Sequence, residues 1–285
     1  MSNPRSIEHV LKLARQRLRA AGIESAALDA RLLLQDATGF AAEDIVLHPD
    51  GVLLPTAIGR FDAMIEQRLQ HQPVSRILGV REFYGRSFKV SPAVLDPRPD
   101  TETVVELALD VMKGKTECRF LDVGTGSGAI AITLAAERPQ WRGVAFDISE
   151  AALAVAQANA DVLQAATRLE FVTGSWFPAG RDTFDLIISN PPYIITSAIA
   201  ELSPDVKDYD PVLALDGGQD GLEAYRMIAQ GAEGRLNPHG VVVVEIGAGQ
   251  KIDVEAIFGG RGFSLVSSRR DLGSHIRGLA FAISR

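Results

Sequence analysis

The sequence Asn190-Pro191-Pro192-Tyr193 follows the apolar run 184–189 and contains residue types suited to holding a flat nitrogen group. The two prolines fix their φ angles and remove two backbone N–H donors, so the carbonyl groups and the Asn190 side chain form a rigid set of acceptors. Acceptors suit an NH2 donor. We expect the Asn190 side-chain oxygen and the Pro191 carbonyl to accept the two N–H groups, while Tyr193 packs on the flat face of the group.

A second candidate site is the glycine-rich sequence 122–128, Asp-Val-Gly-Thr-Gly-Ser-Gly, which joins a predicted strand to a predicted helix. Glycine lets the backbone approach a bound ligand where a side chain would hold it away. The turn alone is ambiguous, because Gly124, Gly126 and Ala129 also satisfy a dinucleotide-binding pattern. Asp147, at the end of the next predicted strand, would accept hydrogen bonds from ribose hydroxyls in either case.

The acceptor set at residues 190–193 distinguishes a methyl-transfer cofactor from a dinucleotide used in hydride transfer. A hydride-transfer enzyme has no use for acceptors that hold an amino or amide nitrogen, whereas an in-line methyl transfer gains mainly from orientation, worth up to about 7–11 kcal/mol. Hydrogen bonds that strengthen as positive charge develops on the nitrogen would favour the transition state, and no separate base is required before transfer. The two sites together favour a methyltransferase that uses S-adenosylmethionine.

Periodic apolar residues predict the elements that position these sites. Residues 6–70 have the three- and four-residue spacing of a small helical bundle, and residues 77–96 suggest a short hairpin before a proline-rich linker. From residue 101 strands and helices alternate, which predicts a mostly parallel sheet covered on both faces, with ligands beyond the carboxyl ends of the strands. The predicted helices are 101–113, 128–137, 149–163, 220–235 and 250–259, and the predicted strands are 119–123, 142–147, 168–173, 184–189, 240–246, 263–269 and 278–284.

Composition excludes several other classes of protein. The 285 residues carry a formal charge of −7, which argues against a large basic face for nucleic acid. The single cysteine, Cys118, cannot form an internal disulfide, and the five histidines lack metal-ligand spacing, so no metal site is expected. No apolar stretch reaches the roughly 18 to 20 residues of a membrane span. We therefore expect a cytoplasmic protein without a membrane partner.

Taken together, these residues resemble the PrmC (HemK) family of protein-(glutamine-N5) methyltransferases, and the resemblance covers nearly the whole chain. The family modifies the glutamine of the Gly-Gly-Gln motif in bacterial peptide-chain release factors. The segments that carry the resemblance are 73–79, 82–85, 97–102, 121–129, 190–193 and 245–247.

The resemblance implies an α/β fold: a class I (Rossmann-like) methyltransferase domain at 101–285, preceded by a helical substrate-recognition domain at 1–76 and a hairpin linker at 77–100. It also implies release factors as the protein substrate and S-adenosylhomocysteine as the product. Asn190, Pro191 and Tyr193 would be catalytic, and Asn190, Pro191, Pro192 and Tyr193 would hold the substrate glutamine. The residues implied to contact the cofactor are Gly124, Thr125, Gly126, Ser127, Gly128, Asp147, Trp176 and Asn190.

Three alternatives stay open at this point. A glutamine methyltransferase acting on a ribosomal large-subunit protein shares both motifs, although the helical bundle favours the release-factor enzyme. A nucleic-acid amino-methyltransferase uses a similar four-residue turn, but the acidic charge balance argues against it. A cofactor-binding sensor would lack catalysis. The sequence departs from the family pattern at Asp100, at 209–211 and at 95–96, which leaves open how a lid-like segment at 194–219 closes.

Overall fold

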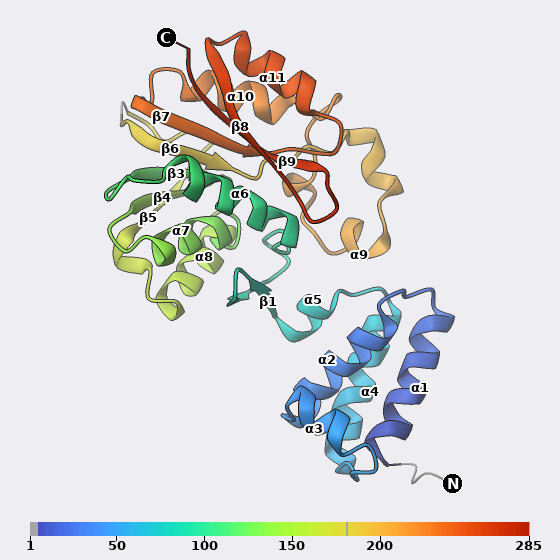
Figure 1. Cartoon of the computed structure of the whole chain (residues 1–285). Helices are drawn as coiled ribbons and strands as arrows, with labels where there is room; N and C mark the ends of the chain where they lie inside the picture. The colour runs from blue at the N-terminus through green and yellow to red at the C-terminus, as the bar shows by residue number, and fades with distance from the viewer. Residues whose placement is uncertain (1–4, 181, 285) are drawn as a thin grey trace. The chain divides into compact units, whose positions relative to one another are not determined.

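The computed structural model of the chain describes residues 5–180 and 182–284, and it divides into two compact units (Figure 1). One unit extends to Gly79 and also takes in Pro204–Tyr209, and the other comprises Val80–Ser203 and the chain from Asp210 onward. The first unit therefore contains a short segment from late in the chain. The finer division expected from sequence, at residues 76 and 100, stays a prediction.

The first unit is a helical bundle whose helices begin where the sequence supplies caps and apolar spacing. The Ser6 hydroxyl accepts from the His9 backbone N–H and caps α1, while Pro55 occupies the first turn of α4. Inside the bundle, the Arg68 Nε donates to the Asp29 carboxylate at 2.7 Å, and both side chains are buried. The helices of this unit are α1 Ile7–Ala20, α2 Ala26–Thr38, α3 Ala42–Leu47, α4 Pro55–Leu69 and α5 Val74–Leu78.

The second unit begins with a two-stranded antiparallel hairpin and continues as a seven-stranded sheet in the order β5-β4-β3-β6-β7-β9-β8. The first five strands of this order run parallel, and β9 is antiparallel to both β7 and β8. The mostly parallel sheet and the small hairpin are therefore confirmed. The strands are β1 Val80–Phe83, β2 Arg86–Lys89, β3 Arg119–Val123, β4 Arg142–Asp147, β5 Leu169–Thr173, β6 Phe184–Ser189, β7 Leu236–Glu245, β8 Phe263–Arg270 and β9 Ile276–Ile283.

Alternate residues of the strands enter two separate hydrophobic cores, one on each face of the sheet, because successive side chains in a strand point to opposite faces. In β3, Phe120 joins the core beneath α6 and α7, whereas Leu121 and Val123 join the core beneath α10 and α11. Both faces are thus covered. The helices of this unit are α6 Pro99–Val111, α7 Ala129–Glu137, α8 Glu150–Val162, α10 Glu223–Ala232 and α11 Lys251–Gly259.

Between β6 and α10 the chain forms short helical turns rather than a long helix. The turns are η2 Thr196–Glu201, α9 Pro204–Lys207 and η3 Val212–Ala214, and α9 lies in the segment that belongs to the first unit. A bridge between Ile194 and Asp216 brings the two ends of this segment together. Among the described residues, no helix is both long and apolar enough to cross a membrane.

Candidate active site

The glycine-rich turn between β3 and α7 is fastened to the neighbouring strand β4 by backbone hydrogen bonds. The N–H groups of Gly124 and Thr125 both donate to the Phe146 carbonyl, at 2.8 and 3.0 Å. The Gly126 N–H donates to Asp147 Oδ2 at 2.9 Å, and the Ser149 N–H donates to Asp147 Oδ1 at the same distance. Asp147 therefore organises two loops, and each carboxylate oxygen keeps lone pairs for a further donor.

Positive φ angles make glycine necessary in this turn. Gly126 has φ +56°, and a Cβ at this position would meet no atom within 4 Å, so the backbone borders open space. At Gly128, with φ +80°, a Cβ would lie 2.7 Å from the Ile132 side chain and 3.2 Å from Ala156. One glycine thus keeps space for a ligand, and the other allows α7 and α8 to pack closely.

A buried carboxyl group, Asp122, supports the turn from inside. Its Oδ2 accepts from the Thr125 hydroxyl at 2.7 Å and from the Ala131 N–H at 3.2 Å. Burial raises the pKa of Asp122 to about 7, the two hydrogen bonds oppose this shift, and the charge of Asp147 adds to it. Asp122 therefore shapes the turn rather than contacting a ligand directly.

A further buried side chain, Asn159 of α8, ties the turn to the hairpin. Its Nδ2 donates to the Ser127 carbonyl at 2.9 Å and to the Lys89 carbonyl at 3.0 Å, while its Oδ1 accepts from the Lys89 N–H at 2.7 Å. All of these amide contacts are made with backbone groups. The hairpin that precedes the sheet is thus anchored to the glycine-rich turn.

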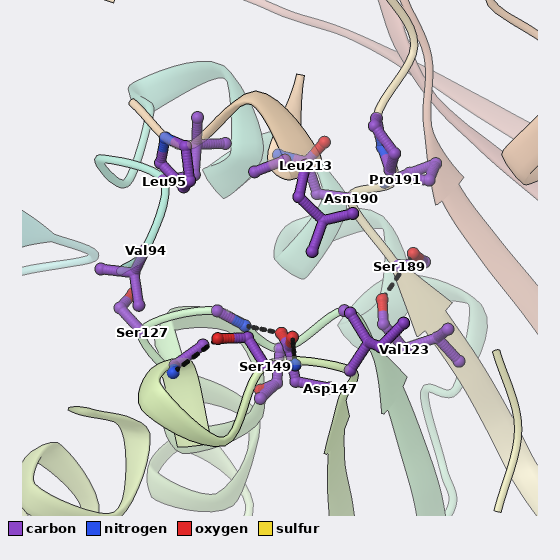
Figure 2. A pocket seen from close by; sticks show the side chains of 18 of the residues that line it. Val94, Leu95, Val123, Ser127, Asp147, Ser149, Ser189, Asn190, Pro191 and Leu213 are labelled. Carbon is purple, nitrogen blue, oxygen red and sulfur yellow. Dashed lines mark hydrogen bonds between the residues drawn. The ribbon is translucent and has the colours of Figure 1, made fainter. Parts of the chain in front are cut away.

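These elements enclose a cavity of about 530 Å³ at the carboxyl edge of the sheet. Figure 2 shows Asp147 and Ser149 on one side of the cavity, Asn190 and Pro191 on the other, and Val94 and Leu95 at a third. The Ser189 hydroxyl donates to the Val123 carbonyl at 2.7 Å and joins the ends of β6 and β3. The predicted site residues that line the cavity are Gly124, Thr125, Gly126, Ser127, Asp147, Trp176, Asn190, Pro191 and Pro192.

The Asn190 side chain is held with a defined orientation. Its Nδ2 donates to the Thr101 hydroxyl at 3.0 Å, which leaves Oδ1 as the group available to an incoming donor. Thr101 is buried in the first turn of α6 and also lines the cavity. The acceptor role expected for Asn190 stays a prediction.

Three of the predicted residues differ from the others in position. Gly128 is not among the described residues that line the cavity, and a Cβ there would meet Ile132 and Ala156. Tyr193 is not among the described residues that line the cavity; it packs against the core beneath α10 and α11, and burial raises its pKa to about 12. Trp176 lines the cavity with φ +63° and packs against the same core. The roles of Tyr193 and Trp176 in binding stay predictions.

Several lining residues were not singled out from the sequence. Ile148 is exposed beside Asp147, and Val94, Leu95 and Arg98 come from the linker after the hairpin. Arg98 pairs with the buried side chain of Asp210 at 2.6 Å. The sequence signals for this side of the cavity were the prolines at 92, 97 and 99 and the resemblance at 97–102. They indicate an irregular segment and a family motif, but not where the segment lies.

The donors and dimensions of the cavity fit S-adenosylmethionine. Its volume lies within the 300–1,000 Å³ or so typical of sites for molecules of this size. Backbone bordering open space at Gly126, a carboxylate at Asp147 and apolar contacts from Ile148 and Trp176 suit a sulfonium nucleoside. No cluster of potential metal ligands occurs within residues 5–180 and 182–284.

Comparisons with known proteins agree with this geometry. Residues 9–79 match the family described as PrmC N-terminal domain, and residues 99–202 match the one described as methyltransferase small domain. A release factor glutamine methyltransferase of Agrobacterium fabrum is 46% identical over 94% of this chain and 94% of its own length. The chain belongs to the release factor glutamine methyltransferase family. Its relative in Cereibacter sphaeroides, with the same description, is 47% identical over 92% of this chain and 93% of its own length.

Solved structures confirm the class of fold. The hMettl16 catalytic domain, solved in complex with a MAT2A 3'UTR hairpin, matches with a TM-score of 0.60 at 18% identity, covering 74% of this chain and 82% of its own. At this identity the likeness shows the fold alone. Family membership and fold together make this chain a methyltransferase that takes its methyl group from S-adenosylmethionine.

Proposed function

We propose that this methyltransferase places the methyl group on the side-chain amide nitrogen of the glutamine in the Gly-Gly-Gln motif of peptide-chain release factors. The observation that carries the proposal is the orientation of Asn190, whose amide nitrogen is engaged by Thr101 so that its oxygen is free to accept from an NH2 group. The names of relatives at 46% and 47% identity support the same acceptor.

In the proposed reaction, S-adenosylmethionine supplies an electrophilic methyl group. The Asn190 oxygen and the Pro191 carbonyl accept the two N–H groups of the glutamine amide and direct its nitrogen toward the cavity. The residues proposed to hold the cofactor are Gly124, Thr125, Gly126, Ser127, Asp147, Trp176 and Asn190, and Gly128 is proposed to support them by closing the turn against α8. Orientation lowers the barrier, because an amide nitrogen is a weak nucleophile that reacts only in a narrow range of geometries. The amide proton is lost to water once the N–C bond has formed.

The test is a transfer assay with S-adenosylmethionine labelled in its methyl group. A native release factor is compared with one whose Gly-Gly-Gln glutamine is replaced by alanine, and a ribosomal large-subunit protein serves as a second acceptor. Label on the native factor alone supports the proposal. Label on the ribosomal protein instead would assign the same chemistry to a different substrate, and label on neither would overturn the assignment of a glutamine acceptor.

A further inference from the structure

A second buried carboxyl group, Glu245, lies at the end of β7 behind the acceptor residues. It follows four consecutive valines, its side chain is 1% exposed, and its Oε2 has no hydrogen-bond partner within the described part of the chain. Such a group is costly to bury, because removing a carboxyl group from water without full hydrogen bonding is unfavourable. Glu245 does not line the cavity. Packing alone therefore does not explain why a carboxyl group is buried at this position.

The neighbours of Glu245 connect it to Asn190. The Thr101 and Tyr193 side chains act on its carboxyl group as hydrogen-bond donors that lower its pKa, and Thr101 in turn accepts from the Asn190 Nδ2 at 3.0 Å. A hydroxyl has a single proton to donate. When the Thr101 proton points to Glu245, the Thr101 oxygen can only accept from Asn190, and the Asn190 amide is held with its nitrogen inward and its oxygen outward.

We propose that Glu245 is a positioning residue for methyl transfer, which acts through Thr101 to hold the Asn190 side-chain oxygen toward the acceptor nitrogen. The inference rests on the proposed function, since it assumes an acceptor that donates N–H groups. If the Asn190 side-chain amide were rotated by about 180°, its NH2 group would face the NH2 group of the acceptor, and the two donors would repel each other. The buried negative charge favours one of the two orientations.

The same chain of hydrogen bonds also bears on the barrier. Each bond in the series from Glu245 to Thr101 to Asn190 polarises the next, which makes the Asn190 oxygen a stronger acceptor. The S–CH3 bond breaks as the N–CH3 bond forms, and positive charge develops on the acceptor nitrogen. A stronger acceptor gains more in that state than in the ground state, so the effect falls on kcat. Glu245 remains outside the cavity and takes no proton from the substrate.

Charge on Glu245 gives the proposal a pH signature. Burial raises the pKa of Glu245 to about 7, with Asp100 of α6 adding to the shift, while Thr101, Arg277 of β9 and Tyr193 oppose it. On the face toward α10, the Tyr225 hydroxyl donates to the Glu245 backbone carbonyl at 3.1 Å. Protonated Glu245 carries a donor of its own and no longer requires the Thr101 proton. We expect kcat to rise with pH through about 7.

The decisive variant is Glu245→Gln, measured with labelled S-adenosylmethionine and a native release factor. We expect kcat to fall about 10- to 100-fold at pH 8, less than direct removal of a transition-state contact. The Kd for S-adenosylhomocysteine should stay within about twofold of the wild type, because the glycine-rich turn is untouched. The pH dependence of kcat near 7 should disappear, which a purely structural role would not produce.

Thr101 supplies a second variant that leaves Glu245 intact. Thr101→Val should lose about as much activity as Glu245→Gln, and the double variant should lose little more, because both residues act through one chain of hydrogen bonds. Thr101→Ser keeps the hydroxyl and should restore most of kcat. As a matched control, Glu137→Gln removes a half-buried carboxylate that pairs with Arg86 and does not line the cavity, and it should keep both kcat and the pH profile.

Wild-type kcat and an unchanged pH profile in Glu245→Gln would overturn the positioning role, as would losses that multiply in the double variant. Retained cofactor affinity in each variant shows that the fold is intact. Failure of the proposed function looks different, because the wild-type protein itself would then leave the release factor unlabelled. That outcome would remove the acceptor on which this role depends.

Discussion

The cofactor side and the acceptor side of the cavity each rest on a buried carboxyl group, but the two groups are connected to the site differently. Asp122 accepts from Thr125 and from the Ala131 N–H, both within nine residues of it in the chain. The carboxyl group of Glu245 instead interacts with the side chains of Thr101 and Tyr193, which come from α6 and from the turn after β6. The first carboxyl group shapes a local turn, and the second joins distant segments.

Asp122 and Glu245 share a raised pKa and incomplete hydrogen bonding. Burial raises the pKa of Asp122 and that of Glu245 to about 7, and in each carboxyl group one oxygen lacks a hydrogen-bond partner among the described residues. The comparison indicates that both halves of the cavity give up stability to hold polar groups in place, which is common at functional sites. Because Asp122 supports the cofactor side and Glu245 the acceptor side, substitutions on the cofactor side should change the Kd for the cofactor, and substitutions on the acceptor side should change kcat.

The largest effect is expected from Asn190→Ala. Removing the acceptor oxygen should lower kcat by about 10²- to 10³-fold, as with the loss of one preorganised transition-state contact. The Kd for S-adenosylhomocysteine should change far less, because Asn190 is only one of the residues proposed to hold the cofactor, and the turn and Asp147 are unaltered. Transfer of labelled methyl groups and calorimetric binding measure the two quantities. Equal losses in both would contradict the separation of the acceptor side from the cofactor side.

An intermediate effect is expected on the free energy of unfolding when either buried carboxyl group is replaced by its amide. Each carboxyl group binds its proton more tightly in the folded than in the unfolded state, so it contributes stability at low pH that is lost as pH rises through about 7. Glu245→Gln and Asp122→Asn should each gain stability relative to the wild type between pH 5 and pH 8. The gain is on the order of 3 kcal/mol, since one pKa unit corresponds to about 1.4 kcal/mol.

Urea unfolding at the two pH values measures this difference. Glu245→Gln should become more stable than the wild type while losing activity, which separates its positioning role from a structural one. In Asp122→Asn the gain is offset by weaker hydrogen bonds to Thr125 and Ala131, and cofactor affinity should fall. A variant-to-wild-type difference that stays constant with pH would refute the raised pKa values.

The smallest effect is expected from Gly126→Ala, tested against Gly22→Ala. Both glycines have positive φ, and at both a Cβ would meet no atom within 4 Å, so each substitution should cost roughly 1–2 kcal/mol of stability. Only Gly126 borders the cavity, and only Gly126→Ala should weaken cofactor binding, by about tenfold. Similar cofactor affinity in both variants would show that the turn does not hold the cofactor.

The same contrast explains what the sequence could predict. The strand 119–123, the glycines after it and Asp147 form local patterns, and the structure has β3 at Arg119–Val123. Asn190 was recognisable because two prolines follow it. Thr101 lies in segment 97–102, which carries the resemblance, but its contact with Asn190 spans 89 residues of sequence and no local pattern predicts it. Glu245 did carry a signal, since an acidic residue directly after four valines is costly to bury, but its partners depend on tertiary packing.

The segment Pro204–Tyr209, which belongs to the helical unit, has a consequence for how the protein is made. The Tyr209 hydroxyl donates to the Gln70 carbonyl at 2.9 Å, so part of the first unit is supplied only after most of the sheet strands have been synthesised. Domains usually fold as they leave the ribosome, starting with the N-terminal one. Here the N-terminal bundle stays incomplete until residue 209 has been added, and a fragment ending at Gly79 lacks one of its own parts.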